Sequence, residues 1–177
     1  MKEKIGWKAR WARYNWGKDP EGRIYRALRA GASYEEIAEM FGIEPRVDVT
    51  EGNVALNEGL QELIDIICGL GSPTKWDSTN ARIGVGDSNT AEDASQTGLQ
   101  GTNKAFKGMD SGYPQRDGQT AKWRATFGGD EANFHWQEFT VVNAADDSGK
   151  NLNRKVADKG TKSSGETWTI ELQITFS

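Results

Sequence analysis

Apolar and polar residues alternate without a break just before the C-terminal serine. The apolar positions are Trp168, Ile170, Leu172, Ile174 and Phe176. A strict period of two predicts a β-strand that turns one face to a core and the other to solvent or to a covering element. Such a strand needs neighbours and an opposing apolar layer, so this segment favours a layered β fold for the chain that precedes it.

Other short stretches between residue 81 and this segment have strand character, and they are separated by turns rich in Gly, Asp and Ser. They are expected at 81–85, 104–109, 119–127, 134–143 and 152–156. In the fourth stretch, Phe134 and Trp136 have one parity whereas Phe139 and Val141 have the other, so a bulge or burial on both faces is expected. Strands without intervening helices predict a mainly β fold, an antiparallel β-sandwich.

The clearest helical pattern runs from Asn53, a plausible N-cap, to Cys68. Its apolar residues recur every three or four positions on a single face: Leu56, Leu60, Leu63, Ile64 and Ile67. Gly59 lowers helix propensity by about 1 kcal/mol relative to Ala, so we expect another backbone to approach closely there. Cys68 is expected to be a buried, unreactive thiol, and a single cysteine excludes an internal disulfide.

Two shorter helices are expected at 21–30 and 34–41, and together they form a small N-terminal helical hairpin. Ser33 and Glu36 have the spacing of a capping box. The phrase SYEEIAEMFGI is similar to the opening of a helix-turn-helix motif. However, Glu44-Pro45 and a strand-like stretch follow directly, and the acidic residues of the second helix would repel phosphates. A role in packing or partner contact is therefore preferred to DNA reading.

The first thirty residues are basic. Residues 1–29 contain nine Lys and Arg against three acidic residues, a net charge of +6, which leaves −10 for the remainder. Within IGWKARWARYNW, cationic and aromatic residues interleave with strand or helix spacing, and we prefer a strand. Three interpretations stay open for this stretch: stacking on nucleic-acid bases, anchoring a protein partner, or a strand packed on the chain's own core. The proposed partner-binding residues are Trp7, Lys8, Arg10, Trp11, Arg13 and Trp16.

This charge asymmetry suggests two regions. Residues 1–50 are expected to form an N-terminal docking segment, with the strand and the helical hairpin. Residues 51–177 are expected to form a domain made of the amphipathic helix and the β-sandwich. Ten per cent aromatic residues, with seven Trp, argue against disorder despite a mean hydropathy of −0.73. The basic start lacks the apolar run of a secretory signal, and no stretch is long and apolar enough for a membrane span.

Residues capable of chemistry do not fall into a recognisable catalytic pattern. Ser88 follows a strand, but no helix follows it as in a nucleophile elbow, and nothing places His135 beside it. Glu131 and Glu138 have opposite parity, so they are not expected to act as an acid and base pair. The acidic stretch containing Asp87, Asn89, Glu92 and Asp93 departs from the EF-hand pattern. We therefore expect no enzymatic activity, no cofactor and no metal.

Four stretches carry a resemblance: NVALNEGLQEL, NARIGVGDSNTAEDASQTGLQG, GYPQRDGQTAKWRATFGGDEANFHWQEFTVVNA and LNRKVADKGTKSSGETWTIELQITF. In this order they resemble a family of small virion structural proteins of tailed bacteriophages. The resemblance extends from about Val54 to the C-terminus and leaves out the first fifty residues.

This resemblance implies a non-enzymatic β-sandwich assembled on the virion after synthesis in the host cytoplasm. The preferred interpretation is a capsid decoration (head-stabilising) protein bound to the major capsid protein lattice or to other virion proteins. The alternative is a tail fibre or collar component that binds a receptor or carbohydrate through the loops 87–93 and 146–150. A homo-oligomer is left open, and neither nucleic acid nor membrane is expected as a partner.

Overall fold

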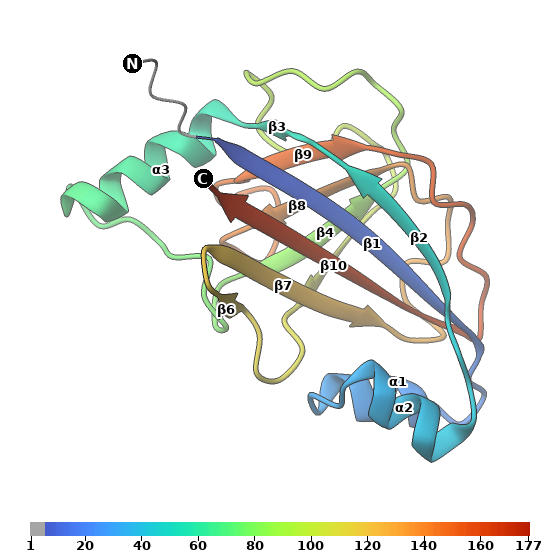
Figure 1. Cartoon of the computed structure of the whole chain (residues 1–177). Coiled ribbons are helices and arrows are strands. Elements are labelled where there is room, and N and C mark those ends of the chain that lie inside the picture. Colours follow the sequence, from blue (N-terminus) through green and yellow to red (C-terminus); the bar gives the residue numbers. More distant parts are fainter. Residues whose placement is uncertain (1–5) are drawn as a thin grey trace.

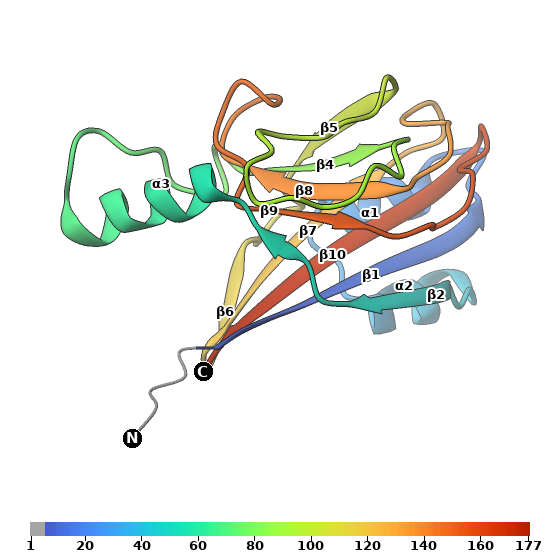
Figure 2. The ribbon, with the colours of Figure 1, turned by 90° about the horizontal axis from the view of Figure 1, so that it is seen from above.

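Two antiparallel five-stranded sheets face each other in the computed structural model, which describes residues 6–177 (Figure 1). The first sheet has the spatial order β2 (Arg46–Glu51), β1 (Trp7–Lys18), β10 (Glu166–Phe176), β7 (Thr120–Phe127) and β6 (Gln115–Asp117). The second has the order β3 (Val54–Ala55), β9 (Asn153–Val156), β8 (Glu138–Val142), β4 (Arg82–Gly86) and β5 (Lys104–Gly108). Figure 2 shows the two layers separately. The predicted antiparallel β-sandwich is thus confirmed.

The alternating C-terminal segment is the central strand of the first sheet. β10 pairs with β1 from Phe176 opposite Trp7 to Trp168 opposite Asn15, and with β7 on its other side. Its apolar positions from Trp168 to Ile174 are buried against the second sheet, because the register on both sides keeps one parity inward; Phe176 at the strand end is exposed. The core between the sheets is aromatic. Trp136 lies edge-on to Trp168 and to Phe127, each at 5.0 Å between ring centroids.

The N-terminal segment belongs to this sandwich. β1 is the second strand of the first sheet, between β10 and β2, and the chain crosses to the second sheet between Glu51 and Val54. The boundary expected at residue 50 therefore does not coincide with a break between two packed units. It falls inside β2, which pairs with β1 over six residues.

The helical hairpin covers one end of the outer face of the first sheet (Figure 1). It consists of α1 (Arg23–Arg29) and α2 (Tyr34–Phe41), and it buries a second apolar cluster made of Trp16, Ile24, Leu28 and Ile37. The expected capping box is present, since the Ser33 hydroxyl accepts from Glu36 N and the Glu36 carboxylate accepts from Ser33 N.

The long helix α3 (Asn57–Cys68) projects from one end of the sandwich (Figures 1 and 2). It begins after Leu56, not after Asn53, because residues 54–55 pair with β9 as β3. The expected close approach at Gly59 is confirmed. A Cβ at this position would lie 2.5 Å from the Asn151 carbonyl oxygen and from the Leu152 Cα.

The strands expected from sequence are all present, with shorter bounds in places. The stretch expected at 134–143 forms strand β8 only over Glu138–Val142, and all five of its residues are buried, so both of its faces are covered. β3 and β6 were not anticipated. They are two and three residues long, too short to show a period.

Candidate functional site

The predicted partner-binding residues of β1 lie mostly inside the molecule. Trp11 is completely buried between the sheets and Trp16 is 3% exposed beneath the helical hairpin, where its Nε1 donates to Thr169 Oγ1. The expectation that these two indoles anchor a partner is wrong, because β1 is an interior strand and covering elements lie on both of its faces.

The other residues of this set divide between interior and surface. Trp7 is half-buried and donates to Asn53 Oδ1 at 3.0 Å. Arg13 faces the core side, 4.6 Å above the Trp168 ring and 3.8 Å from Asp48 Oδ2. Lys8 is exposed and Arg10, half-buried, lies 3.9 Å from Glu51. Of the proposed partner-binding cations, only Lys8 and Arg10 lie on the outer face of the first sheet. Lys2, Lys4 and Ile5 fall outside the described residues.

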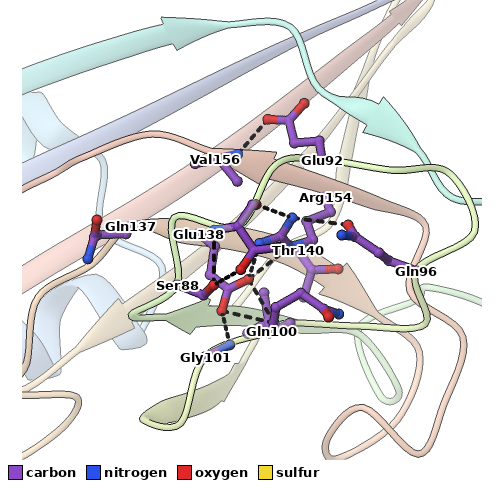
Figure 3. A network of polar contacts seen from close by, with 12 residues as sticks. Ser88, Glu92, Gln96, Gln100, Gly101, Gln137, Glu138, Thr140, Arg154 and Val156 are labelled. Carbon is purple, nitrogen blue, oxygen red and sulfur yellow. Dashed lines mark hydrogen bonds and ion pairs between the residues drawn. The ribbon is translucent and has the colours of Figure 1, made fainter.

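A buried ion pair lies under the long loop between β4 and β5. Glu138 on β8 and Arg154 on β9 both have 0% exposure, and Arg154 Nε donates to Glu138 Oε2 at 2.8 Å (Figure 3). The loop closes over this pair. The backbone N–H groups of Gln100 and Gly101 donate to the Glu138 carboxylate, at 2.9 Å and 2.6 Å for the shortest contacts.

Arg154 contacts the other arm of the same loop. Its Nη1 donates to the Thr90 carbonyl at 2.9 Å and to Gln96 Oε1 at 3.0 Å. Glu92, farther along the loop, accepts from Val156 N at 2.5 Å (Figure 3). Glu138 and Arg154, from neighbouring strands, thus hold the β4–β5 loop in place through several hydrogen bonds.

Glycine makes this arrangement possible. A Cβ at Gly86 would lie 2.4 Å from Glu138 Oε1, and one at Gly101 would lie 2.3 Å from Asp87 Oδ1. The GVGDS phrase, which runs from the end of β4 into the loop, is therefore explained by packing. It lets the loop descend onto the carboxylate, and it does not present Ser88 as a nucleophile.

The geometry assigns this network a structural role. A carboxylate that accepts from two backbone N–H groups and an arginine, with no exposed surface, is out of reach of a substrate. Glu131 lies apart from it and pairs with Lys107. The pairing of Glu138 with Arg154 could not be read from the sequence, because a 16-residue separation carries no periodic signal.

A second buried network joins the helical hairpin to the sheet. Asp110, 1% exposed, accepts from Arg124 Nε at 2.9 Å, from Arg29 Nη1 at 2.9 Å and from Thr126 Oγ1 at 2.8 Å. Burial raises the pKa of Asp110, and the neighbouring Arg124 guanidinium opposes that rise. Arg124 also donates to the Leu28 carbonyl, so this network fixes α1 on β7.

The remaining candidates for chemistry do not converge. His135 Nε2 lies 2.6 Å from Asp158 Oδ1, and this contact holds the pKa of Asp158 below its usual value. Ser88 Oγ lies 2.9 Å from the Thr90 hydroxyl. Within residues 6–177, no group of three or more His, Cys, Asp or Glu side chains has metal-binding geometry.

Cys68 is exposed, contrary to the expectation of a buried thiol. It is the last residue of α3, at the end of the helix that projects beyond the sandwich (Figure 2).

The most distinctive surface feature is the outward face of α3. Leu63 and Ile66 pack against the core and Leu56 is fully buried, but Leu60, Ile64 and Ile67 of the expected apolar face point to solvent. The exposed apolar residues, with their exposed fractions, are Leu60 (37%), Ile64 (54%), Ile67 (74%) and Leu70 (54%) in the following turn. We call these four residues the α3 stripe.

The fully exposed residues of α3 carry no charge, and the half-buried Asp65 beside Ile64 is the one acidic side chain of this helix next to the α3 stripe. The exposed residues of the helix itself are Asn57, Leu60, Gln61, Ile64, Ile67 and Cys68. Two of its acidic residues face the body, where Glu58 accepts from Asn151 N at 2.8 Å and Glu62 accepts from Thr74 N at 2.7 Å. Sequence periodicity identifies this apolar face of the helix, but it does not show that several of its residues are exposed to solvent.

Comparisons with known proteins return no match: no family model, no curated protein and no solved structure is similar to this chain. None of the helices within residues 6–177 combines the length and apolar character needed to cross a membrane.

Proposed function

We propose that this chain is a non-enzymatic structural protein of a tailed-phage virion, bound as a decoration protein to the major capsid protein. The observation that carries the proposal is the α3 stripe, an exposed apolar surface on a helix that projects from a rigid body (Figure 1). The order of the four sequence phrases that resemble phage virion proteins supports the assignment to a particle.

The chemistry of the α3 stripe supports an apolar, uncharged partner surface. Three large apolar side chains exposed on one helix face, followed by Leu70 just beyond the helix end, are unusual for a surface that stays in water. Burying each of them on a partner contributes about 1–2 kcal/mol. The stripe is smaller than the roughly 1,200 Å² buried in a typical stable complex, so a single contact would be weak.

A lattice compensates for such weakness. When a rigid protein meets a regular array at more than one point, each further contact becomes intramolecular and the overall affinity rises steeply. The buried ion pairs under the β4–β5 loop and at Asp110 keep the body rigid, so little conformational entropy would be lost on binding.

The tail alternative has weaker support from the loops it needs. Asp93 accepts from Ser95 N and Asp146 accepts from Ser148 N, each at 2.8 Å, so both carboxylates are used within their own turns. A sugar would have to displace these bonds. Binding of the purified chain to a glycan array would favour the tail function, whereas a copy number near that of the capsid protein favours decoration.

The direct test is binding of the purified chain to capsids that lack it, followed by sedimentation and quantification of bound protein. The variant Ile64→Ser/Ile67→Ser should lower capsid occupancy at least tenfold at equal concentration, since it removes the centre of the stripe. Gln61→Ser, on the exposed side of the same helix, is the matched control and should bind as the unaltered chain does. Full occupancy by the double variant would refute the assignment of α3 as the docking element.

A further inference from the structure

The hairpin end of the molecule carries a second candidate surface, a groove between α2 and β2 with a volume of about 430 Å³. Its floor is apolar and is contributed by three elements, β1, α2 and β2, and by the turn between α2 and β2. The rings of Tyr14 and Tyr34 stack at 4.2 Å between centroids, and Pro45 and Val47 continue the floor toward the edge of the sheet. Val47 is 52% exposed, so the floor is open to solvent.

The rim of this groove is acidic. Glu35 and Glu39 on α2 and Glu44 in the following turn line it, all three exposed, and no Lys or Arg is among the lining residues. Within residues 6–177 none of the three glutamates forms an ion pair at 4.0 Å or less. At the edge of the groove, Arg10 of β1 contacts the Tyr14 hydroxyl, and its ion pair is with Glu51 outside the groove.

Helix geometry adds to the negative potential. α2 has no basic residue in its last turn, so the partial negative charge of its C-terminal carbonyls adds to that of Glu39 and Glu44. Three uncompensated carboxylates around an apolar floor attract a cation and an apolar group together. Such a surface repels phosphate and carboxylate groups.

We propose that this groove docks a segment of a partner protein in which an apolar side chain is flanked by Lys or Arg. The apolar side chain lies against Tyr14 and Val47, and the flanking cations meet Glu35, Glu39 and Glu44. The hairpin and α3 lie at opposite ends of the molecule (Figure 1). The chain therefore has two docking surfaces of different chemistry, which suits a protein that bridges two neighbours. This inference does not depend on what α3 binds.

The test is fluorescence anisotropy at about 0.1 M salt, where charges beyond roughly 10 Å are screened. The probe is a fluorescein-labelled peptide containing Lys-Leu-Leu-Lys-Lys-Leu. Two further probes carry Glu in place of every Lys, or Ser in place of every Leu. The first probe should bind the full chain with saturation, and the other two should bind at least tenfold more weakly.

Two variants of equal charge change locate the site. Glu35→Gln/Glu39→Gln/Glu44→Gln should weaken binding of the lysine–leucine probe at least tenfold. Asp93→Asn/Asp130→Asn/Asp146→Asn, in loops outside the groove, should change it by less than twofold. Circular dichroism melting of both variants verifies that they are folded.

Three results would overturn the proposal. The first is an equal loss in both triple variants, which would mean attraction by net charge alone. The second is equal binding of the serine-substituted probe, which would leave the apolar floor without a role. The third is no saturable binding of the lysine–leucine probe to the unaltered chain. None of these results affects capsid binding by the Ile64→Ser/Ile67→Ser variant, so the two proposals fail separately.

Discussion

At the scale of single residues, one buried ion pair holds the long loop between β4 and β5 against the sheet. Glu138 and Arg154 are both withdrawn from water, and such a pair offsets its desolvation only when the remaining lone pairs and protons are also satisfied. Here the carboxylate receives two backbone N–H groups and the guanidinium reaches loop oxygen atoms through Nη1, whereas Nη2 makes only the ion contact with Glu138. The pair thus orders a loop of seventeen residues, 87–103, that has no helix or strand of its own to hold it.

Replacing Glu138 by Gln should lower the free energy of unfolding by about 3–5 kcal/mol, because Arg154 would stay buried with its charge unpaired. Urea denaturation measures this loss. Glu51→Gln is the control: the Glu51 side chain is 72% exposed beside Arg10, so its change should stay within about 0.5 kcal/mol. Equal effects of the two substitutions would show that the buried pair does not hold the loop.

A single residue, Lys162, makes the free energy of unfolding depend on pH. Its side chain is fully buried, and its Nζ donates to the Gly128 carbonyl and to Asn133 Oδ1. Burial lowers the pKa of Lys162 from 10.5 to about 8. Between these two values the unfolded chain keeps a proton that the folded chain has released, so the contribution of this group to the free energy of unfolding rises with pH.

We therefore expect Lys162→Met to flatten the dependence of the free energy of unfolding on pH between about pH 7.5 and about pH 9.5. Urea titrations across this window, on both proteins, measure the two slopes. The window ends below the region where tyrosines with raised pKa values, such as Tyr34, lower stability as pH rises. Parallel slopes would contradict the assignment to Lys162.

At the scale of elements, close packing decides where α3 lies. The helix crosses the turn before β9 so closely that Gly59 meets backbone atoms of Asn151 and Leu152. This contact orients the helix so that Leu63 and Ile66 reach the core and Ile64 and Ile67 do not. The orientation of the docking surface proposed for α3 thus depends on residue 59 being glycine, which has no side chain.

Gly59→Ala tests this dependence. In an isolated helix Ala would stabilise by about 1 kcal/mol, but here its Cβ would clash with backbone that cannot move freely. We expect a net loss of about 2 kcal/mol in the free energy of unfolding, as for other overpacked sites. Gln61→Ala, an exposed position two residues on, should be neutral or slightly stabilising. A stabilised Gly59→Ala variant in urea denaturation would disprove the close contact.

At the scale of the whole molecule, the N-terminal strand is part of the scaffold. β1 pairs with β10 and β2 and contributes Trp11 to the main core and Trp16 to the second one. A chain without it would expose both cores and leave β10 with an unpaired edge.

Deleting residues 1–17 should therefore abolish folding and not merely weaken partner binding. The expected result is loss of the dispersed amide spectrum in two-dimensional NMR and of the thermal unfolding transition. Lys8→Ser, which removes only an exposed cation of the same strand, should leave both unchanged. A folded deletion variant would restore the view of residues 1–50 as a separate docking segment.

Sequence alone determined what depends on local period and local geometry. Three features depend only on residues close together in sequence. They are the alternation of 168–176, the capping box at Ser33 and Glu36, and the close backbone approach expected at Gly59. Tertiary structure alone decided which faces are covered. Periodicity places Trp7 and Trp11 on one face of a strand and Ile64 on the apolar face of a helix. It does not say what packs against either face. Only long-range pairing placed Trp11 between two sheets, joined Glu138 to Arg154 and left Ile64 in water, because burial depends on partners distant in sequence.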